Sequence, residues 1–377
     1  MLNKIRSKLI LKYIFEKIKN RKKLNILKYN KELSNKLNID KQDFQAYKLL
    51  KQMNRKFNLK VEDIDIEELY IKKRKFKNKV FDYIKEIGFK NLKELYLNGK
   101  SELNLEGIEK IKFNNLQRLS IYGNYNPNNI NKFELINCKE LKELNLKNIF
   151  EPDIKILEKV KFEKLEILDL SLNRIIDISI LEKVNFKELK ELDLSFNFIK
   201  DIDILERVDF KNLEILTIFF NPITDINVLA KVKFERLKTL NLSFNKFSDI
   251  ACVEKAQFKQ LKELDLSYNQ ISDINILENV EFNYLYKLNL GGNKISDIDI
   301  LEKVNFKELK ELNLKENKIS NINVLGRVDF KQLKVLDLSS NKISDIDILE
   351  EVNFEELKEL NLNYNLISDI EIRLSEI

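Results

Sequence analysis

The chain has 377 residues, a formal net charge of +6, no histidine and only two cysteines. The lack of histidine excludes Ser–His and Cys–His nucleophile pairs and His-based metal sites. Cys138 and Cys252 are too few for a disulfide framework, which favours a reduced setting inside the cell, in the cytoplasm or the nucleus. No phosphate-binding or dinucleotide-binding motif is present. The sequence therefore predicts a protein that is not an enzyme and that uses no catalytic residue, metal or cofactor.

Residues 1–75 contain no repeat and are expected to form a basic, helical N-terminal region. Apolar residues recur at spacings of three and four, which predicts helices over about residues 3–19, 22–37 and 41–53. Lysines interrupt the apolar stretches, so we expect neither a signal peptide nor a membrane span. Such helices would cover the apolar end of a repeat array, as terminal units must.

The charge of this region is strongly basic. Residues 1–80 carry 24 Lys and Arg against 9 Asp and Glu, and Lys72–Lys79 is the densest run. A basic segment can attract the phosphates of nucleic acid or of an anionic membrane. A solvated charge run is the more common explanation, and we expect neither nucleic acid nor a membrane as partner.

Residues 76–377 are dominated by a phrase that returns every 24 residues, Phe–x–x–Leu–x–x–Leu–x–Leu–x–x–Asn. Nine consecutive copies begin at the Phe of positions 162, 186, 210, 234, 258, 282, 306, 330 and 354. Degenerate copies from Phe89, Phe113 and Cys138 bring the array to about twelve units. A period of 20–50 residues is the signature of a solenoid, which presents an extended concave surface.

Residues 186–209 illustrate one unit. Leu192 and Leu194 alternate with polar neighbours, which predicts a short strand. After Asn197, apolar residues recur every three positions, which suits a short α-helix or 3₁₀ turn. Asp203 and Glu206 match a capping box at its start, and similar pairs recur in other units.

The phrase resembles that of the leucine-rich repeat family over about residues 81–377. The resemblance implies an α/β solenoid, with a parallel sheet on the concave face, short 3₁₀ or α segments on the convex face, an Asn ladder and a Phe spine. The segment Asn–x–Ile–x–Asp–Ile–x–x–Leu, as in NKISDIDIL from Asn293, is similar to the subclass of phosphatase-1 regulators and bacterial internalins. Those units have 22 residues, whereas these have 24 and carry an added Phe.

Two alternative functions follow from such resemblances. One is a phosphatase regulatory subunit. The other rests on the N-terminal region, where six apolar residues are placed as in an F-box: Leu9, Ile14, Phe15, Ile18, Leu24 and Leu27. An F-box-like protein would bind a ubiquitin-ligase adaptor through these helices and a substrate through its repeats. The leading Leu–Pro and the later Trp of an F-box are missing.

Strand positions around Leu–x–Leu contact ligands in the family, and here most of them are polar or charged. One stretch differs, because the residue before the Asn is aromatic in four consecutive units and the exposed positions of the unit from Phe210 read Ile215, Thr217, Phe219 and Phe220. Exposed aromatic side chains are typical of interfaces, although rings at a turn can also pack only against one another. We predict a monomer that binds a protein partner on the concave face. The predicted contact residues are Phe196, Phe198, Ile215, Thr217, Phe219, Phe220, Phe244 and Tyr268.

A column of carboxylates, Asp169, Asp193, Asp265 and Asp337, occupies one position of its repeats. It could bind a cation or a basic ligand, but a solvated surface column is the interpretation that we favour.

Overall fold

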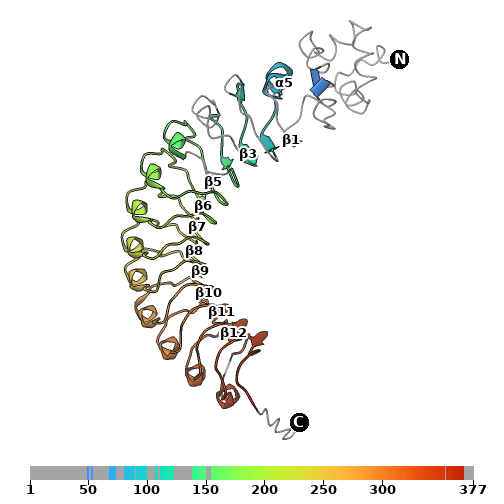
Figure 1. The fold of residues 1–377 in the computed structure, drawn as a ribbon. Coiled ribbons are helices and arrows are strands. Elements are labelled where there is room, and N and C mark those ends of the chain that lie inside the picture. Colours follow the sequence, from blue (N-terminus) through green and yellow to red (C-terminus); the bar gives the residue numbers. More distant parts are fainter. Residues whose placement is uncertain are drawn as a thin grey trace, which may run out of the picture. The chain divides into compact units, whose positions relative to one another are not determined.

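The computed structural model describes residues 49–50, 52–53, 68–73, 80–89, 91–99, 107–108, 111–122, 138–149, 154–352 and 354–368. Two compact units are present, Met1–Lys164 and Leu165–Ile377. In each unit the described strands are parallel and follow one another in chain order (Figure 1). No helix within the described ranges combines the length and the apolar character needed to cross a bilayer.

In the described part of the first unit, the elements with complete bounds are four strands, an α-helix and a 3₁₀ turn. They are β1 (Glu68–Lys73), α5 (Val80–Ile87), β2 (Glu94–Gly99), β3 (Arg118–Tyr122), β4 (Glu143–Asn145) and η4 (Ile154–Glu158). The central leucines of the four strands lie in register and are fully buried. α5 buries Phe81, Ile84 and Ile87, one face of its amphipathic pattern.

β1 corrects one expectation, because it lies in the segment that we predicted to be helical. Leu69 and Ile71 are buried while Tyr70 between them is exposed, so residues 68–73 follow the period of two of a strand. Of the three predicted helices, only residues 49–50 and 52–53 are described, and these are helical. The F-box-like resemblance and the rest of the predicted cap lie outside the described residues.

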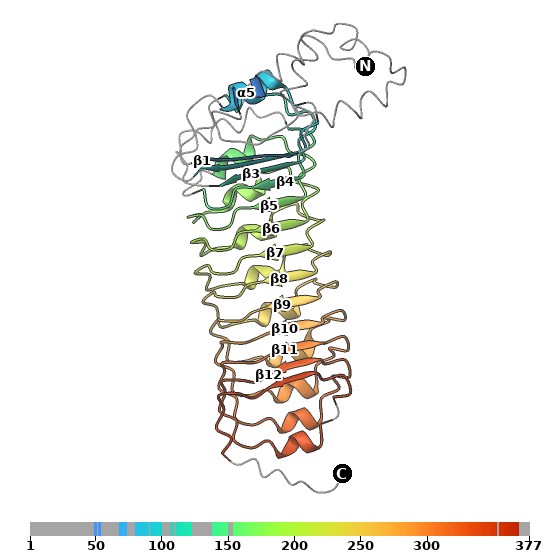
Figure 2. The same cartoon turned by 90° about the vertical axis from the view of Figure 1, so that its right-hand side faces the viewer.

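The second unit alternates short strands with 3₁₀ turns. Its strands are β5 (Ile167–Asp169), β6 (Glu191–Asp193), β7 (Ile215–Thr217), β8 (Thr239–Asn241), β9 (Glu263–Asp265), β10 (Lys287–Asn289), β11 (Glu311–Asn313), β12 (Val335–Asp337) and β13 (Glu359–Asn361). Its turns are η5 (Ser179–Glu182), η6 (Asp203–Glu206), η7 (Asn227–Ala230), η8 (Ala251–Glu254), η9 (Asn275–Asn279), η10 (Asp299–Glu302), η11 (Asn323–Gly326) and η12 (Asp347–Glu350). Within this unit the strands line the concave side and the turns the convex side, which confirms the predicted solenoid (Figures 1 and 2).

The predicted Asn ladder is present. Nδ2 of Asn197 donates to Leu194 O of its own coil at 2.9 Å and to Leu170 O of the preceding coil at 3.1 Å. Its Oδ1 accepts the backbone N–H of Ile175, also in the preceding coil, at 3.1 Å. The two donated bonds recur at Asn221, Asn245, Asn269, Asn293, Asn317, Asn341 and Asn365. The accepted bond recurs at each of them except Asn269, whose Oδ1 is buried without a hydrogen-bond partner. Each amide therefore satisfies buried backbone groups of two coils at once.

The core of the coils follows the repeat phrase. The repeated Phe side chains from Phe162 to Phe330 are at most 2% exposed, as expected for the predicted Phe spine. Burial ends with the last described coil. Leu360 on β13 is 39% exposed, whereas Leu336 at the same position of β12 is fully buried. A coil with a described neighbour on one side only thus leaves part of its apolar side chains exposed, whereas a coil between two neighbours buries them.

The 3₁₀ turns do not begin with the predicted capping boxes. In η6 the N-cap residue is Ile202, and no side chain caps the turn. Oδ1 of Asp201 instead accepts the backbone N–H of Asp203 at 2.8 Å. The same bond recurs from Asp177, Asp225, Asp249, Asp273, Asp297, Asn321 and Asp345. The prediction was wrong because an Asx bond from two residues earlier already satisfies the first N–H of the turn.

Candidate functional site: an aromatic stripe

The residue before each ladder Asn has an unusual backbone. Phe196, Phe220, Phe244 and Tyr268 have φ angles between 52° and 57°, in the left-handed region that side chains rarely adopt. Hydrogen bonds to the next coil hold them there, since Phe220 N–H donates to Ser243 O at 3.0 Å and Phe244 N–H to Ser267 O at 2.9 Å. The rings therefore project from a backbone that the sheet fixes.

Five rings form a continuous run, here called the aromatic stripe: Phe196, Phe219, Phe220, Phe244 and Tyr268. The centroids of Phe196 and Phe220 are 4.8 Å apart, those of Phe220 and Phe244 5.9 Å, and those of Phe244 and Tyr268 4.2 Å. Phe219 packs edge-on against Phe196 at 4.7 Å. Aromatic pairs at such distances attract one another. The structure thus brings together five of the eight predicted contact residues.

Contact between the rings does not hide them from solvent. Phe220 is 51% exposed, Phe244 43% and Phe196 37%. Large apolar side chains at this exposure are not core, because the core Phe residues of the same coils are at most 2% exposed. If the rings packed only against one another and bound no partner, the exposure of this apolar surface to water would have no explanation.

The stripe ends at Tyr268 because the next coil has a glycine, Gly292, in the ring position. The sequence analysis did not identify this glycine as functional. Gly292 occupies the slot before Asn293, and a Cβ atom there would lie 2.5 Å from the Tyr268 ring. Because glycine leaves that space empty, the ring lies over the next coil and its OH donates to Glu316 Oε1 at 3.1 Å. Lys315 Nζ lies 5.6 Å from the ring centroid. The end of the stripe is thus held in place by a polar contact.

The three other predicted residues lie around the stripe. Ile215 and Thr217 are half-buried on β7 and face away from the core, because Leu216 between them is buried. Phe198 is 54% exposed beyond the Asn, and its N–H donates to Ile175 O. Sequence reasoning missed Leu172, which is 40% exposed in the same slot as the stripe residues, one coil earlier. The shared slot before the Asn was the signal that could have found it.

The column of carboxylates has a structural role. Oδ1 of Asp193 accepts the backbone N–H of Ser195 at 2.8 Å, and Asp169, Asp265 and Asp337 make the same bond. Asn241 makes it as well, so the bond requires an Asx oxygen and no charge. Within the described ranges, no group of three or more Cys, Asp or Glu residues could hold a metal ion.

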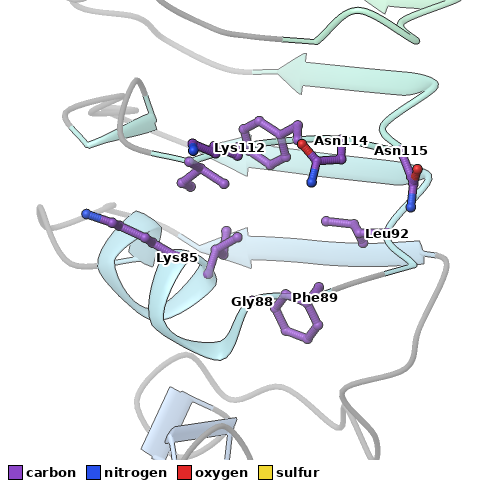
Figure 3. A pocket seen from close by; sticks show the side chains of 10 residues that line it. Lys85, Gly88, Phe89, Leu92, Lys112, Asn114 and Asn115 are labelled. Atoms are coloured by element: carbon purple, nitrogen blue, oxygen red, sulfur yellow. The ribbon is translucent and has the colours of Figure 1, made fainter. Parts of the chain in front are cut away.

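A pocket of about 350 Å³ lies in the first unit, beside α5 (Figure 3). Ile84, Leu92 and Phe113 are among its apolar lining residues, and Lys85 and Lys112 add two ammonium groups. Its ten lining residues include no carboxylate and no thiol. This composition provides no acid–base pair and no nucleophile, so the pocket does not indicate catalysis.

Family models for leucine-rich repeats match residues 163–207, 187–231, 235–279 and 331–374 in pairs of copies, and residues 283–343 as a longer run. Together they cover more than half of the chain, which therefore belongs to the leucine-rich repeat family. Members of this family are generally interaction scaffolds. No curated protein sequence matches the chain significantly.

Solved structures agree with this assignment. An internalin (InlF) of Listeria monocytogenes is 24% identical, with a TM-score of 0.59 over 84% of this chain and 93% of the internalin. A leucine-rich repeat protein of Leptospira interrogans is 28% identical, with a TM-score of 0.61 over 75% of this chain and 70% of its own. TLR13 in its complex with ssRNA13 is 20% identical, with a TM-score of 0.60 over 80% of this chain and 43% of the receptor. These likenesses extend the fold assignment beyond the residues that the family models match.

Proposed function

We propose that this chain is a non-catalytic scaffold that captures a protein partner on the concave side of its second unit, through the aromatic stripe. The observation that carries the proposal is a run of half-exposed rings on a backbone that hydrogen bonds to the next coil hold in place. A rigid aromatic surface loses little conformational entropy when it binds, and aromatic side chains dominate binding hot spots.

The scaffold is proposed to act inside the cell and without enzymatic chemistry. Cys138 and Cys252 are both buried as free thiols, and burial raises the pKa of each to about 12. Thiols in this state are poor nucleophiles and serve as small core side chains. Both observations suit a reducing compartment and a structural role for the two cysteines.

The test uses the double variant Phe219→Ser and Phe220→Ser. It copies the Ser339–Ser340 pair of the coil of β12, where Ser340 has the same left-handed backbone, with φ of 56°. The rings contribute contacts of about 0.5–1.5 kcal/mol each, so the variant should remain folded. Affinity capture from the native cell should lose the partner with this variant.

The matched control is Tyr364→Ser, which removes an 85% exposed ring from the same slot of the coil of β13, outside the stripe. It should retain the partner. Identical partner lists for the wild type and the double variant would refute the proposal, and collapse of the folded state would show that the two rings belong to the core.

A further inference from the structure

We propose that the segment bound on the aromatic stripe is an extended stretch of a protein, with an apolar side chain flanked by Lys or Arg two residues away on each side. This inference rests on the proposed function, because it names the chemistry of the partner that the stripe would capture. It is carried by the charges of the strands that border the stripe and by the distance between them.

The strand positions beside the stripe carry only negative or neutral side chains. From β5 to β9, the residues that face away from the core include five carboxylates and no basic group. The carboxylates are Asp169, Glu191, Asp193, Glu263 and Asp265. The next strand carries the first basic residue, Lys287, whose Nζ lies 2.8 Å from Glu311. A negative surface of this kind favours a basic partner.

The centre of this surface is uncharged. β7 presents Ile215 and Thr217, and β8 presents Thr239 and Asn241. Phe219 and Phe220 follow one residue after β7, beyond Ile218, so the neutral window adjoins the half-exposed rings. The strands on either side, β6 and β9, each carry two carboxylates. An apolar side chain fits the window, and a cation fits each border.

Hydrogen bonds on the β9 border leave its negative charge in place. Asp265 accepts from the Ser267 N–H and hydroxyl and from Asn289, and Glu263 accepts from the Tyr286 hydroxyl. All these donors are neutral. Lys190 and Lys238 directly precede β6 and β8, and each pairs with a glutamate of the preceding coil. Lys190 Nζ lies 2.7 Å from Glu166, and Lys238 Nζ lies 2.6 Å from Glu214.

The spacing of the strands sets the spacing of the partner's residues. β6 and β9 are three strand steps apart, or about 14 Å at about 4.8 Å per step. An extended chain covers about the same distance in four residues, and its residues i, i+2 and i+4 project to one side. A segment that crosses the strands would therefore read basic–x–apolar–x–basic, with its middle side chain between β7 and β8.

The experiment is a selection of random twelve-residue peptides displayed on phage, with the full chain as bait. Parallel selections use the Phe219→Ser and Phe220→Ser double variant and the Tyr364→Ser control. The expected result is enrichment of the basic–x–apolar–x–basic pattern on the wild type and on the control, and its loss on the double variant. Changing both basic residues of an enriched synthetic peptide to Glu should weaken binding at least tenfold.

Two protein variants test the charges directly. Asp193→Asn and Asp265→Asn keep the Oδ1 acceptor for the following Ser N–H, as Asn241 does in its own coil. Each should weaken an enriched peptide about two- to fivefold, the range of an exposed ion pair, and the difference should shrink at high salt.

The outcomes separate this inference from the proposed function. Enrichment of acidic or uncharged apolar peptides that require the rings would overturn the partner chemistry and leave the stripe as the binding site. Peptides that bind the double variant equally well would overturn both. A selection that enriches no pattern would count against the extended basic segment, while affinity capture still judges the proposed function.

Discussion

Asn245 offers a direct test of the ladder that supports the stripe. Its Nδ2 donates to Ile218 O at 3.1 Å and to Leu242 O at 3.0 Å, and its Oδ1 accepts the Ile223 N–H at 3.2 Å. In an Asn245→Ala variant the two carbonyls keep a second amide partner, because Asn221 also reaches the first and Asn269 the second. The N–H of the fully buried Ile223 loses the acceptor that the amide supplies.

An unsatisfied buried N–H costs about 1–3 kcal/mol, and each further lost hydrogen bond about 0.5–1.5 kcal/mol. The sum over the one N–H and the two donated bonds predicts a loss of about 2–6 kcal/mol in the free energy of unfolding. The matched variant is Asn365→Ala in the last described coil, which also removes the acceptor of one N–H, that of Ile343. Water can reach this partly buried site, so about 1–2 kcal/mol is expected.

The measurement is urea unfolding followed by far-ultraviolet circular dichroism, because the chain contains no Trp for fluorescence. Equal losses for the two variants would refute the argument from burial. Losses below about 1 kcal/mol for both would show that the amides do not stabilise the turns.

Three further predictions concern single positions. Gly292→Ala should lower the free energy of unfolding by about 1–3 kcal/mol and weaken partner capture, because the added Cβ would clash with the Tyr268 ring at the end of the stripe. In Gly291→Ala the added Cβ would meet a flexible Lys side chain at 3.0 Å, so the effect in urea unfolding should be smaller. Asp201→Ala should lower the free energy of unfolding by about 0.5–1 kcal/mol in the same assay, whereas Asp203→Ala should change it little. A larger loss for Asp203→Ala than for Asp201→Ala would support a capping box at Asp203 instead. The two buried thiols, whose pKa burial raises to about 12, should react with a disulfide reagent at pH 8 only after urea is added, and fast reaction of the folded chain would contradict their burial.

The repeat phrase made most of the second unit predictable. Self-similarity at 24 residues placed every strand from β5 to β13, because the same Leu and Asn positions recur without insertion. The same reasoning missed β1, since ELYIKK lacks the Phe and the Asn of the phrase. It also favoured a local capping motif over an Asx bond that acts from two residues earlier.

The site was predictable only in part. Its rings could be counted along the sequence, but their left-handed backbone could not be foreseen, because Leu, Phe, Tyr, Glu and Ser all occupy that slot. Asn148 and Gly292 in the same slot were hints, because these residue types tolerate positive φ. The space that Gly292 leaves for Tyr268 follows from packing between coils, which a single sequence does not display.

The ladder has a consequence for how such a protein can change. Each Asn bonds only its own coil and the one before it, so a coil can be removed whole. Deletion of residues 210–233 would join Asp209 to Phe234, and Ile199 would meet the amide of Asn245 in place of that of Asn221. The deleted cassette carries Phe219 and Phe220 and nothing that its neighbours lack for folding. The exposed residues of this chain can therefore be exchanged in steps of 24 residues while the hydrogen-bonding pattern of the remaining coils is kept.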